Sequence, residues 1–253
     1  MLHHIYGHNP VRECLRARRR HINKIILTKN VKKTKIIREI VGLAKDLKVL
    51  IKYTERNKLD SVEKGHQNVI LEVGNLPTVE MCDILDHARK LNQLPFVLAL
   101  DHLEDPQNVG ALLRTAESVG VHGVIIPKKR AVRITASVVS ASAGATEHLN
   151  VAYVPNLSRA LHELKKENVW VVGVEKHDTA QLYHKVDLDR ALVLVLGHEG
   201  KGLSRLVRET CDFLIEFPMQ GKIESLNVSV AGALSLYEAW RSRKFLKPNL
   251  TKF

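Results

Sequence analysis

The sequence of 253 residues predicts an α/β protein with two domains, a small N-terminal one and a larger C-terminal one built on a parallel sheet. Segments with helical periodicity alternate along the chain with short apolar runs that have the length of strands. After residue 96 these runs become more hydrophobic, as is typical of parallel strands buried on both faces. With 45% hydrophobic residues, the chain can bury the core that such a sheet requires.

Residues 1–73 are expected to form a compact α/β unit. A first helix over 11–17 follows Asn9, which can cap it, and Pro10, which suits the first helical position. Thr34 can cap a second, amphipathic helix that runs to about residue 47. Strands are expected over 22–27, 49–53 and 69–73, and a linker over 74–95 contains a connecting helix at 78–91.

Residues 96–253 are expected to form the C-terminal domain, an alternation of buried strands and helices. In parallel sheets of this kind, ligands bind outside the carboxyl ends of the strands, so the loops that follow the strands are candidate sites. Strands are expected over 96–100, 123–126, 169–174, 191–196 and 213–217, and helices over 107–119, 135–142, 157–167 and 203–209.

The last predicted helix begins at Asn227 and carries apolar residues at steps of three and four. Asn227 suits the N-cap, because its side-chain oxygen can accept a hydrogen bond from an unpaired amide of the first turn. The simplest interpretation is a capped core helix, although a helix entered through Ser and Asn can also hold a small ligand at its N-terminus. The apolar face consists of Leu226, Val230, Ala233, Leu234, Tyr237 and Trp240.

The formal net charge of +12 is concentrated at the front of the chain. Residues 1–72 hold 17 lysines and arginines against 7 aspartates and glutamates, whereas residues 73–253 hold 22 against 20. A concentrated positive field attracts polyanions by releasing their counterions. Nucleic acid is therefore the leading partner, with a lysine-rich surface that serves only solubility as the alternative.

Targeting and redox signals are few. The sequence contains no run of about 18 apolar residues and no signal peptide, so a soluble, cytoplasmic protein without a membrane span is expected. The three cysteines, Cys14, Cys82 and Cys211, are odd in number and widely spaced. This spacing predicts reduced thiols rather than disulfides or a zinc site.

Three loops at predicted strand ends carry candidate chemistry. The first leads through Asn108 to Arg114, which lies off the apolar face of a helix that Gly120 is expected to end. The second, residues 196–203, has three glycines that let backbone groups approach a ligand closely. The third runs from Phe217 into the turn before Asn227. The second loop matches neither the dinucleotide nor the phosphate-loop spacing, and no histidine pair has zinc-protease spacing, so no metal site is expected.

Together the three loops resemble, in order and spacing, the three motifs of the SpoU/TrmH branch of the SPOUT RNA methyltransferases. The resemblance covers residues 96 to about 243. The motifs are Asn108 with Arg114, then Leu196-Gly197-x-Glu199-Gly200-x-Gly202, and finally Pro218-Met219 followed by Ser225-Leu226-Asn227-Val228-Ser229.

The front of the chain resembles one subgroup of this family. Tyr6-Gly7-x-Asn9-Pro10-Val11 and His66-Gln67 are similar to the substrate-binding domain, related to a ribosomal-protein fold, of the bacterial 23S ribosomal RNA guanosine 2'-O-methyltransferases. Asn68 stands where this subgroup commonly has glycine, and asparagine tolerates a left-handed backbone better than most residues. Phe217 replaces a usual aliphatic residue, which matters little for a backbone contact.

The resemblance implies a deep trefoil knot in the C-terminal part of the sheet, S-adenosylmethionine bound bent within it, and a homodimer. It implies S-adenosylmethionine-dependent 2'-O-methylation of a ribose, favouring a guanosine of 23S ribosomal RNA. Transfer RNA as the substrate, or a non-catalytic RNA-binding protein, are the alternatives. By position, the cofactor contacts would be Gly197, Phe217 and Leu226, and the polar catalytic set would be Asn108, Arg114, Glu199, Ser225 and Asn227.

The resemblance also suggests a division of roles. Because a guanidinium is essentially always protonated, Arg114 is expected to clamp an RNA phosphate and stabilise the developing alkoxide rather than act as a base. Asn108 would position the ribose or the arginine, and Glu199 would orient the arginine. Ser225 and Asn227 would shape the turn.

Overall fold

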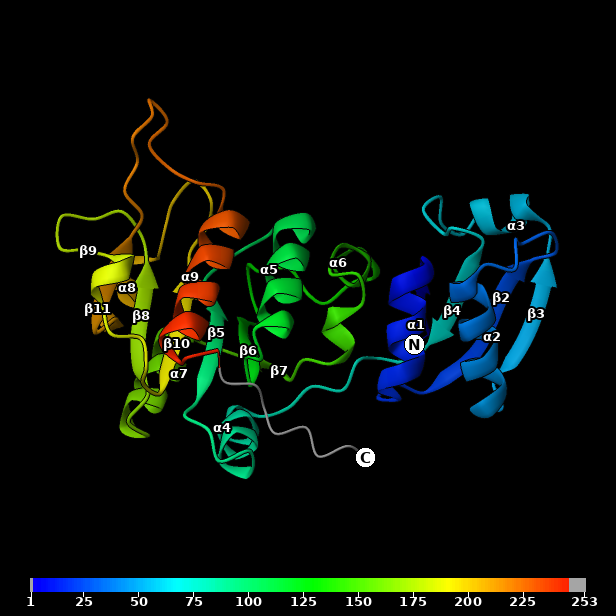
Figure 1. Ribbon diagram of the computed structural model, residues 1–253, viewed down its shortest axis with the longest axis horizontal. Coiled ribbons are helices and arrows are strands. Elements are labelled where there is room, and N and C mark those ends of the chain that lie inside the picture. The colour runs from blue at the N-terminus through cyan, green and yellow to red at the C-terminus, as the bar shows by residue number, and fades with distance from the viewer. Residues whose placement is uncertain (1, 246–253) are drawn as a thin grey trace. The chain divides into compact units, whose positions relative to one another are not determined.

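The computed structural model describes residues 2–245, and the chain divides into two compact units (Figure 1). Unit 1 comprises residues 1–77 and 133–148, and unit 2 comprises residues 78–132 and 149–253. Residues 246–253, the end of the predicted C-terminal domain, lie outside the described residues. The segment 133–148 belongs to unit 1 although the chain on both sides of it belongs to unit 2.

Unit 1 is built on a four-stranded mixed sheet. Its first elements are β1 (His3–Tyr6), α1 (His8–Ala17), β2 (Ile22–Thr28), α2 (Lys35–Asp46), β3 (Leu50–Thr54), α3 (Arg56–Asp60) and β4 (Val69–Val73). The strand order is β1-β4-β2-β3, with only the β2–β3 pair parallel. Apolar side chains of α1 and α2, such as Leu15 and Ile40, form a core with those of the sheet. The predicted strands and helices are present, whereas the short β1 and α3 are not foreseen by periodicity.

The two predicted caps of unit 1 have different outcomes. Thr34 caps α2 as predicted, because its hydroxyl accepts a hydrogen bond from the Ile37 amide at 3.4 Å. Asn9 does not cap α1, so that prediction is wrong. The helix begins earlier, after Gly7 with φ of 88°, and the His8 amide donates to the side-chain oxygen of Gln67 at 2.9 Å. A partner from a distant loop thus satisfies the first turn, and no local pattern reports it.

The segment 133–148 contributes a helix and a turn to unit 1. It forms α6 (Ala136–Ala141) and the 3-10 turn η1 (Ala145–Glu147). Val139 of α6 belongs to the core of unit 1, and Gly144 passes close to α1. A Cβ atom at Gly144, where φ is 89°, would lie 2.9 Å from the Cα of Pro10. Only glycine fits there, so the segment is an integral part of unit 1.

Unit 2 contains a seven-stranded sheet in which every pair is parallel, as predicted. Its elements are α4 (Met81–Lys90), β5 (Phe96–Leu100), α5 (Pro106–Ser118), β6 (Gly123–Pro127), β7 (Val151–Val154), α7 (Leu157–Lys166), β8 (Trp170–Val174), β9 (Gln181–Leu182), η2 (Tyr183–Lys185), β10 (Leu192–Leu196), α8 (Arg205–Thr210), β11 (Phe213–Glu216) and α9 (Val228–Ser242). The order is β7-β6-β5-β10-β8-β11-β9. No helix within residues 2–245 is long and apolar enough to cross a membrane.

The strand order brings distant parts of the chain together. Strand β10 lies between β5 and β8, and β11 lies on the other side of β8. Because these strands are parallel, their carboxyl ends share one edge of the sheet. The loops that follow β5, β8, β10 and β11 therefore meet at this edge, as Figure 1 allows the reader to trace.

Helix α9 is capped as predicted but packs through another face. Asn227 is its N-cap and accepts from the Ser229 amide at 2.9 Å. Three residues of the predicted apolar face, Val230, Leu234 and Tyr237, are nearly half exposed. The helix instead packs through the face that carries Gly232, Leu236 and Ala239, and a Cβ atom at Gly232 would lie 2.2 Å from Leu112 of α5. The interpretation of the apolar stripe as the core-facing side is therefore wrong.

Candidate active site

The loop after β10, residues 197–203, is a tight turn that only glycine permits at two positions. His198 and Gly202 exchange backbone hydrogen bonds of 3.0 and 2.8 Å, which close the loop. A Cβ atom at Gly197 would lie 2.3 Å from the carbonyl carbon of Gly202, and Gly202 has a φ of 66°. The backbone therefore folds back on itself at the sheet edge. Gly200 meets no such constraint, since a Cβ atom there would have no neighbouring atom within 4 Å among residues 2–245.

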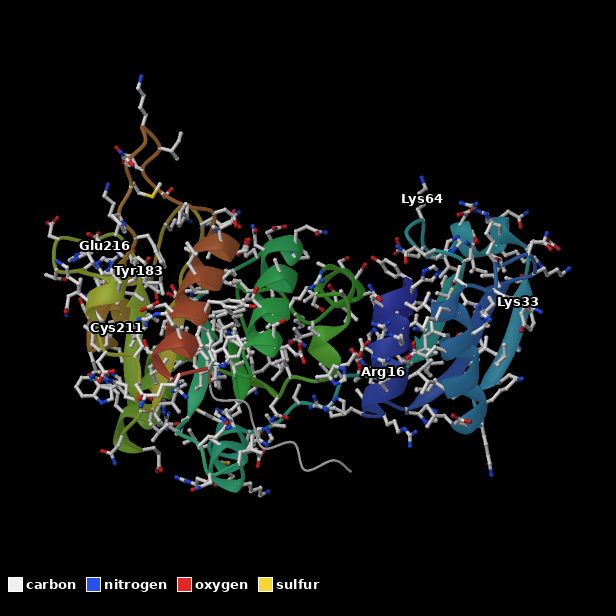
Figure 2. All side chains as sticks on the ribbon, in the orientation of Figure 1. Arg16, Lys33, Lys64, Tyr183, Cys211 and Glu216 are labelled. Carbon is white, nitrogen blue, oxygen red and sulfur yellow. The ribbon has the colours of Figure 1, made fainter. Side chains whose placement is uncertain are left out.

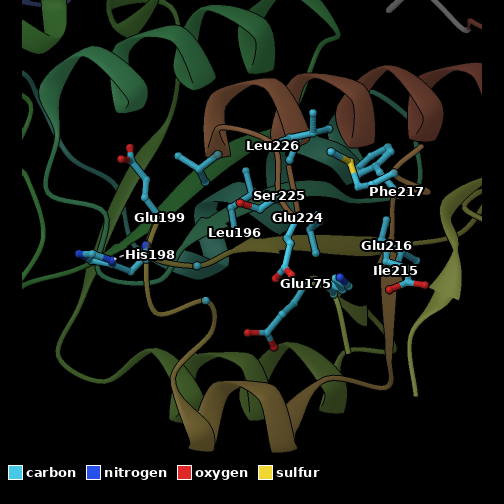
Figure 3. Close-up of a pocket in the computed structure, with 18 residues that line it drawn as sticks. Glu175, Leu196, His198, Glu199, Ile215, Glu216, Phe217, Glu224, Ser225 and Leu226 are labelled. Carbon is cyan, nitrogen blue, oxygen red and sulfur yellow. Dashed lines mark hydrogen bonds between the residues drawn. The ribbon is translucent and has the colours of Figure 1, made fainter. Parts of the chain in front are cut away.

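This glycine loop forms one wall of a cavity of about 290 Å³ in unit 2 (Figure 3). The other walls come from the ends of β8 and β11 and from the turn that leads into α9. Apolar side chains, including Ile215, Phe217 and Leu226, line one part of it. The cavity lies at the carboxyl ends of the strands, where ligands of parallel sheets bind.

Four carboxylates border the cavity against a single lysine. They belong to Glu175, Glu199, Glu216 and Glu224, and the lysine is Lys176. Figure 3 labels these four glutamates among the residues that line the cavity, and Figure 2 also marks Glu216. An apolar wall beside an excess of negative charge suits a ligand that combines a flat ring with a positive charge.

A chain of hydrogen bonds joins the three predicted motifs. The amide nitrogen of Asn108 donates to the carboxylate of Glu199, and the amide oxygen of Asn108 accepts from Asn227 at 3.1 Å. The oxygen of Asn227 in turn accepts from both the amide and the hydroxyl of Ser229. Since a backbone amide can only donate, the orientation of Asn227 follows, and with it that of Asn108. The Asn108 amide is therefore held in one orientation between Glu199 and Asn227.

Asn108 itself is not the cap of its helix. Asp105 is the N-cap of α5, with its carboxylate accepting from the Asn108 amide at 2.9 Å, and Pro106 follows it. The Asn108 side chain is thereby free to join the other two motifs. Gly120, with a φ of 75°, follows the C-cap of the helix, as the sequence predicts.

The predicted site residues fall into two groups, with Arg114 apart from both. Gly197, Glu199, Phe217, Ser225 and Leu226 line the cavity. Asn108 and Asn227 lie outside its lining but are bonded to Glu199 as a chain. Arg114 is exposed on α5, and its side chain makes no hydrogen bond or ion pair with any residue between 2 and 245. The described structure thus pairs Glu199 with Asn108 and not with Arg114.

Sequence patterns did not single out Glu175, Glu216 or Glu224. Glu175 is the first residue after β8, and Glu216 ends β11. Both lie at the carboxyl ends of parallel strands, where ligands bind. A search of the last residue of each predicted strand and the residue after it could therefore have identified Glu175 and Glu216. Among the described residues, no group of three or more His, Cys, Asp or Glu side chains could hold a metal ion.

The two N-terminal motifs meet in unit 1. Gln67 and Asn68 both have left-handed backbones, with φ of 50° and 68°, which fits the tolerance expected of Asn68. His66 is buried and accepts from the Asn68 amide at 2.8 Å through Nδ1. Gln67 holds the first turn of α1 through His8. Residues 6–11 and 66–68 therefore form one structural feature.

Two family models match the chain. Residues 95–237 match the SpoU rRNA Methylase family, and residues 4–79 match the RNA 2'-O ribose methyltransferase substrate binding domain. YacO of Bacillus subtilis (strain 168), provisionally named a TrmH family tRNA/rRNA methyltransferase, is 44% identical over 241 residues, which cover 95% of this chain and 96% of YacO. A protein of Staphylococcus aureus (strain MSSA476) with the same family name is 41% identical over 94% of this chain and 96% of its own.

Solved structures show the same fold. The SpoU methyltransferase AviRb from Streptomyces viridochromogenes, in complex with the cofactor AdoMet, has a TM-score of 0.79 at 21% identity, over 97% of this chain and 92% of its own. The A. aeolicus TrmH/SpoU tRNA modifying enzyme has a TM-score of 0.56 at 27% identity, over 67% of this chain and 91% of its own. The likeness to AviRb spans the full two-unit chain, whereas the likeness to the A. aeolicus enzyme spans two thirds of it.

Proposed function

The chain belongs to the SpoU/TrmH family of RNA methyltransferases, and on this premise we propose that it methylates the 2'-hydroxyl of a guanosine ribose in 23S ribosomal RNA, with S-adenosylmethionine as the methyl donor. The observation that carries the proposal is the convergence of three loops. Asn108, Glu199 and Asn227 come from three separate segments and form one chain of hydrogen bonds beside a cavity.

The cavity fits the proposed cofactor. S-adenosylmethionine carries a sulfonium, and its methyl group is therefore already activated for transfer. Ile215, Phe217 and Leu226 would cover the adenine. Glu175 is paired with Arg208, but the other three carboxylates of the lining still outnumber its one lysine, which suits a positively charged ligand. Gly197 would contact it through the backbone, in a cradle that a Cβ atom would fill. AviRb, which has the same fold, has been solved in complex with AdoMet.

The protein must then align the ribose hydroxyl and help it lose its proton. The S–CH3 bond breaks as the O–CH3 bond forms, and the proton leaves with a phosphate oxygen or water. The side chain of Arg114 has no partner among the described residues, so its guanidinium can clamp an RNA phosphate and stabilise the developing negative charge. Glu199 and Asn227 would fix the Asn108 amide that positions the ribose.

Unit 1 supports ribosomal RNA as the substrate. The excess of basic residues lies in the first 72 residues, and Figure 2 shows Lys33 and Lys64 projecting from this unit. The A. aeolicus tRNA modifying enzyme, which aligns with 67% of this chain, gives no match for a third of it. A substrate in ribosomal RNA would place the enzyme in the cytoplasm. Transfer RNA is the alternative, and parallel assays on both RNAs would separate the two.

The exposed face of α9 supports a homodimer. Val230, Leu234 and Tyr237 form an apolar stripe on the surface of unit 2, of the kind that a second copy of the chain would cover. Sedimentation of the protein as a monomer at micromolar concentration would contradict this proposal. The trefoil knot implied by the family stays a prediction.

Substitution of Arg114 tests the proposed chemistry. We expect Arg114→Ala to bind S-adenosylmethionine as the wild type does but to lose about 100-fold or more of its methyl transfer to 23S ribosomal RNA. Binding would be measured by calorimetry and transfer with a radiolabelled methyl group. The control is Arg159→Ala, which removes an exposed arginine from α7. An Arg114→Ala enzyme with full activity would refute the clamp.

A further inference from the structure

Glu175, at the carboxyl end of β8, is hydrogen-bonded to the end of the glycine loop, residues 197–203. Its Oε1 accepts from the Leu203 amide at 3.0 Å. The same oxygen lies where a Cβ atom of Gly202 would be, only 1.9 Å from that position. Because residue 202 is glycine, the loop backbone can lie directly against this carboxylate. Glu175 then holds the loop through its hydrogen bond to the Leu203 amide.

A second carboxylate holds the next amide from the opposite side. Asp101 follows β5 and accepts from the Ser204 amide at 2.7 Å. Since β10 lies between β5 and β8, the loop that leaves β10 is held by one carboxylate from each neighbouring strand. Asp101 is fully buried and does not line the cavity, whereas Glu175 does. Glu175 is therefore the anchor that links loop shape to the cavity.

Arg208 of α8 clamps Glu175. Its Nε and Nη2 donate to the two carboxylate oxygens at 2.5 and 2.9 Å, and Nη2 also donates to the Leu203 carbonyl at 3.1 Å. The paired geometry uses both oxygens, which limits the rotation of the carboxylate. The ion pair also raises the pKa of Arg208. One arginine thereby ties Glu175, the end of the loop and α8 together.

We propose that Glu175, clamped by Arg208, is a positioning residue that sets the affinity for S-adenosylmethionine by holding the glycine loop in its binding shape. The inference rests on the proposed function of the cavity. A Cβ atom at Gly197 would lie 2.5 Å from the Leu203 amide nitrogen, so the end of the loop lies directly against Gly197, and a shift of Leu203 changes this part of the cavity wall. Glu175 acts through the loop, and its charge is already matched by Arg208.

The test compares Glu175→Ala and Glu175→Gln with the wild type in two measurements. We expect Glu175→Ala to raise the Kd for S-adenosylmethionine about tenfold, and Glu175→Gln about threefold, because glutamine keeps an oxygen for the Leu203 amide. The Kd for S-adenosylhomocysteine, which lacks the positive sulfonium, should rise by the same factors. Hydrogen exchange should show faster exchange of the amides of residues 203 and 204 in both variants without ligand.

Steady-state kinetics distinguish a role of Glu175 in positioning the glycine loop from a general disruption of the active site. With saturating S-adenosylmethionine, kcat and the KM for RNA should stay within about twofold of the wild type. The control is Glu209→Ala, which removes another ion pair of α8, the exposed Arg205–Glu209 pair at 2.9 Å, and should leave all values unchanged. In Glu175→Ala, further replacement of Arg208 by methionine should add little, because the two residues act as a unit.

The possible failures are distinguishable. A wild-type protein that binds no S-adenosylmethionine would contradict the proposed function itself. A wild type that binds, together with a Glu175→Ala variant that binds equally well, would overturn only the role of Glu175. Weaker binding of S-adenosylmethionine with unchanged binding of S-adenosylhomocysteine would also overturn positioning, because it would show a direct contact of charges.

Discussion

Two glutamates, Glu147 in unit 1 and Glu199 in unit 2, each belong to a hydrogen-bonded network, but their surroundings differ. The Glu147 side chain is fully buried, and Arg20 donates to its two oxygens at 2.8 and 2.7 Å. Glu199 is exposed at the cavity, and its partner is the neutral amide of Asn108. A carboxylate that is shielded from solvent and paired with a charged group contributes to the stability of the fold. A solvent-facing carboxylate whose partner is neutral can still interact with a charged ligand.

The buried network joins segment 133–148 to the rest of unit 1. Arg20 also donates to the carbonyl of Gly74, and Arg19 donates to the carbonyl of Glu147. When an ion pair is buried, its remaining donors and acceptors must also form hydrogen bonds. Otherwise the free-energy cost of removing both charges from water exceeds the attraction between them. Removing one partner leaves the other charge buried alone. The comparison therefore predicts that Glu147 matters for stability and the Glu199 network for activity.

The largest expected effect is that of Glu147→Ala. The variant leaves the Arg20 guanidinium buried without its partner, so we expect unit 1 to lose about 3–5 kcal/mol of its free energy of unfolding. Urea denaturation followed by circular dichroism measures this loss. The matched control is Glu163→Ala, which breaks the exposed Arg159–Glu163 pair and should cost no more than about 0.5 kcal/mol. Equal losses in the two variants would show that burial does not distinguish these carboxylates.

A buried histidine of unit 2 tests whether a side chain contributes to stability because it is buried, and not because it belongs to unit 1. His122 is 3% exposed, and its Nδ1 accepts from the Phe96 amide at 3.0 Å. Burial, together with a smaller effect of the nearby Arg243, lowers the pKa of His122 to about 4. The unfolded chain therefore binds the proton more readily than the folded one. The contribution of His122 to stability is complete above pH 6.5 and is lost as the pH falls towards 4.

We expect this loss to amount to about 3 kcal/mol between pH 6.5 and pH 4. Urea denaturation at a series of pH values measures it, and the pH dependence should be smaller in His122→Asn by about that amount. His177→Asn, which replaces an exposed histidine of unit 2, should keep the wild-type pH dependence. An identical pH dependence in His122→Asn and the wild type would show that this histidine is not buried in its neutral form.

Sequence patterns predicted the features that depend on residues close together in the chain. The caps at Thr34 and Asn227, the end of α5 at Gly120 and the apolar strands of the parallel sheet all depend on neighbours in the sequence. The cap at Asn9 failed because the first turn of α1 receives its partner from Gln67, far along the chain. Periodicity showed that α9 has an apolar face, but only packing against Leu112 shows which face is buried.

The candidate site divides in the same way. The resemblance to the family motifs predicted that Glu199 and Asn108 belong to one site, but the hydrogen bond between them depends on the strand order. Glu175 carried no motif, since its role arises from the neighbouring position of β8 and β10. Likewise, no sequence pattern assigns segment 133–148 to unit 1, because Glu147 meets Arg20 only in the folded chain.

Two asparagines that cap helices should contribute less to stability than Glu147 or His122 does, and they separate residues that only stabilise the fold from those that also act in the site. Asn227 caps α9 and Asn156 caps α7, each accepting a backbone amide at 2.9 Å. Replacing either by alanine should cost about 1 kcal/mol of stability. Only Asn227 also donates to Asn108, so only Asn227→Ala should lose activity, by about tenfold in methyl transfer.

Asn227→Asp separates the two roles of that side chain. Aspartate is as good a cap as asparagine, so the free energy of unfolding should stay within about 0.5 kcal/mol of the wild type. It cannot donate to the oxygen of Asn108, however, and any rotation of the Asn108 amide towards it would turn that oxygen to the carboxylate of Glu199. We therefore expect the tenfold loss of methyl transfer to persist in a fully stable protein. Full activity in Asn227→Asp would mean that the cap alone matters, and that Glu199 holds Asn108 without help from α9.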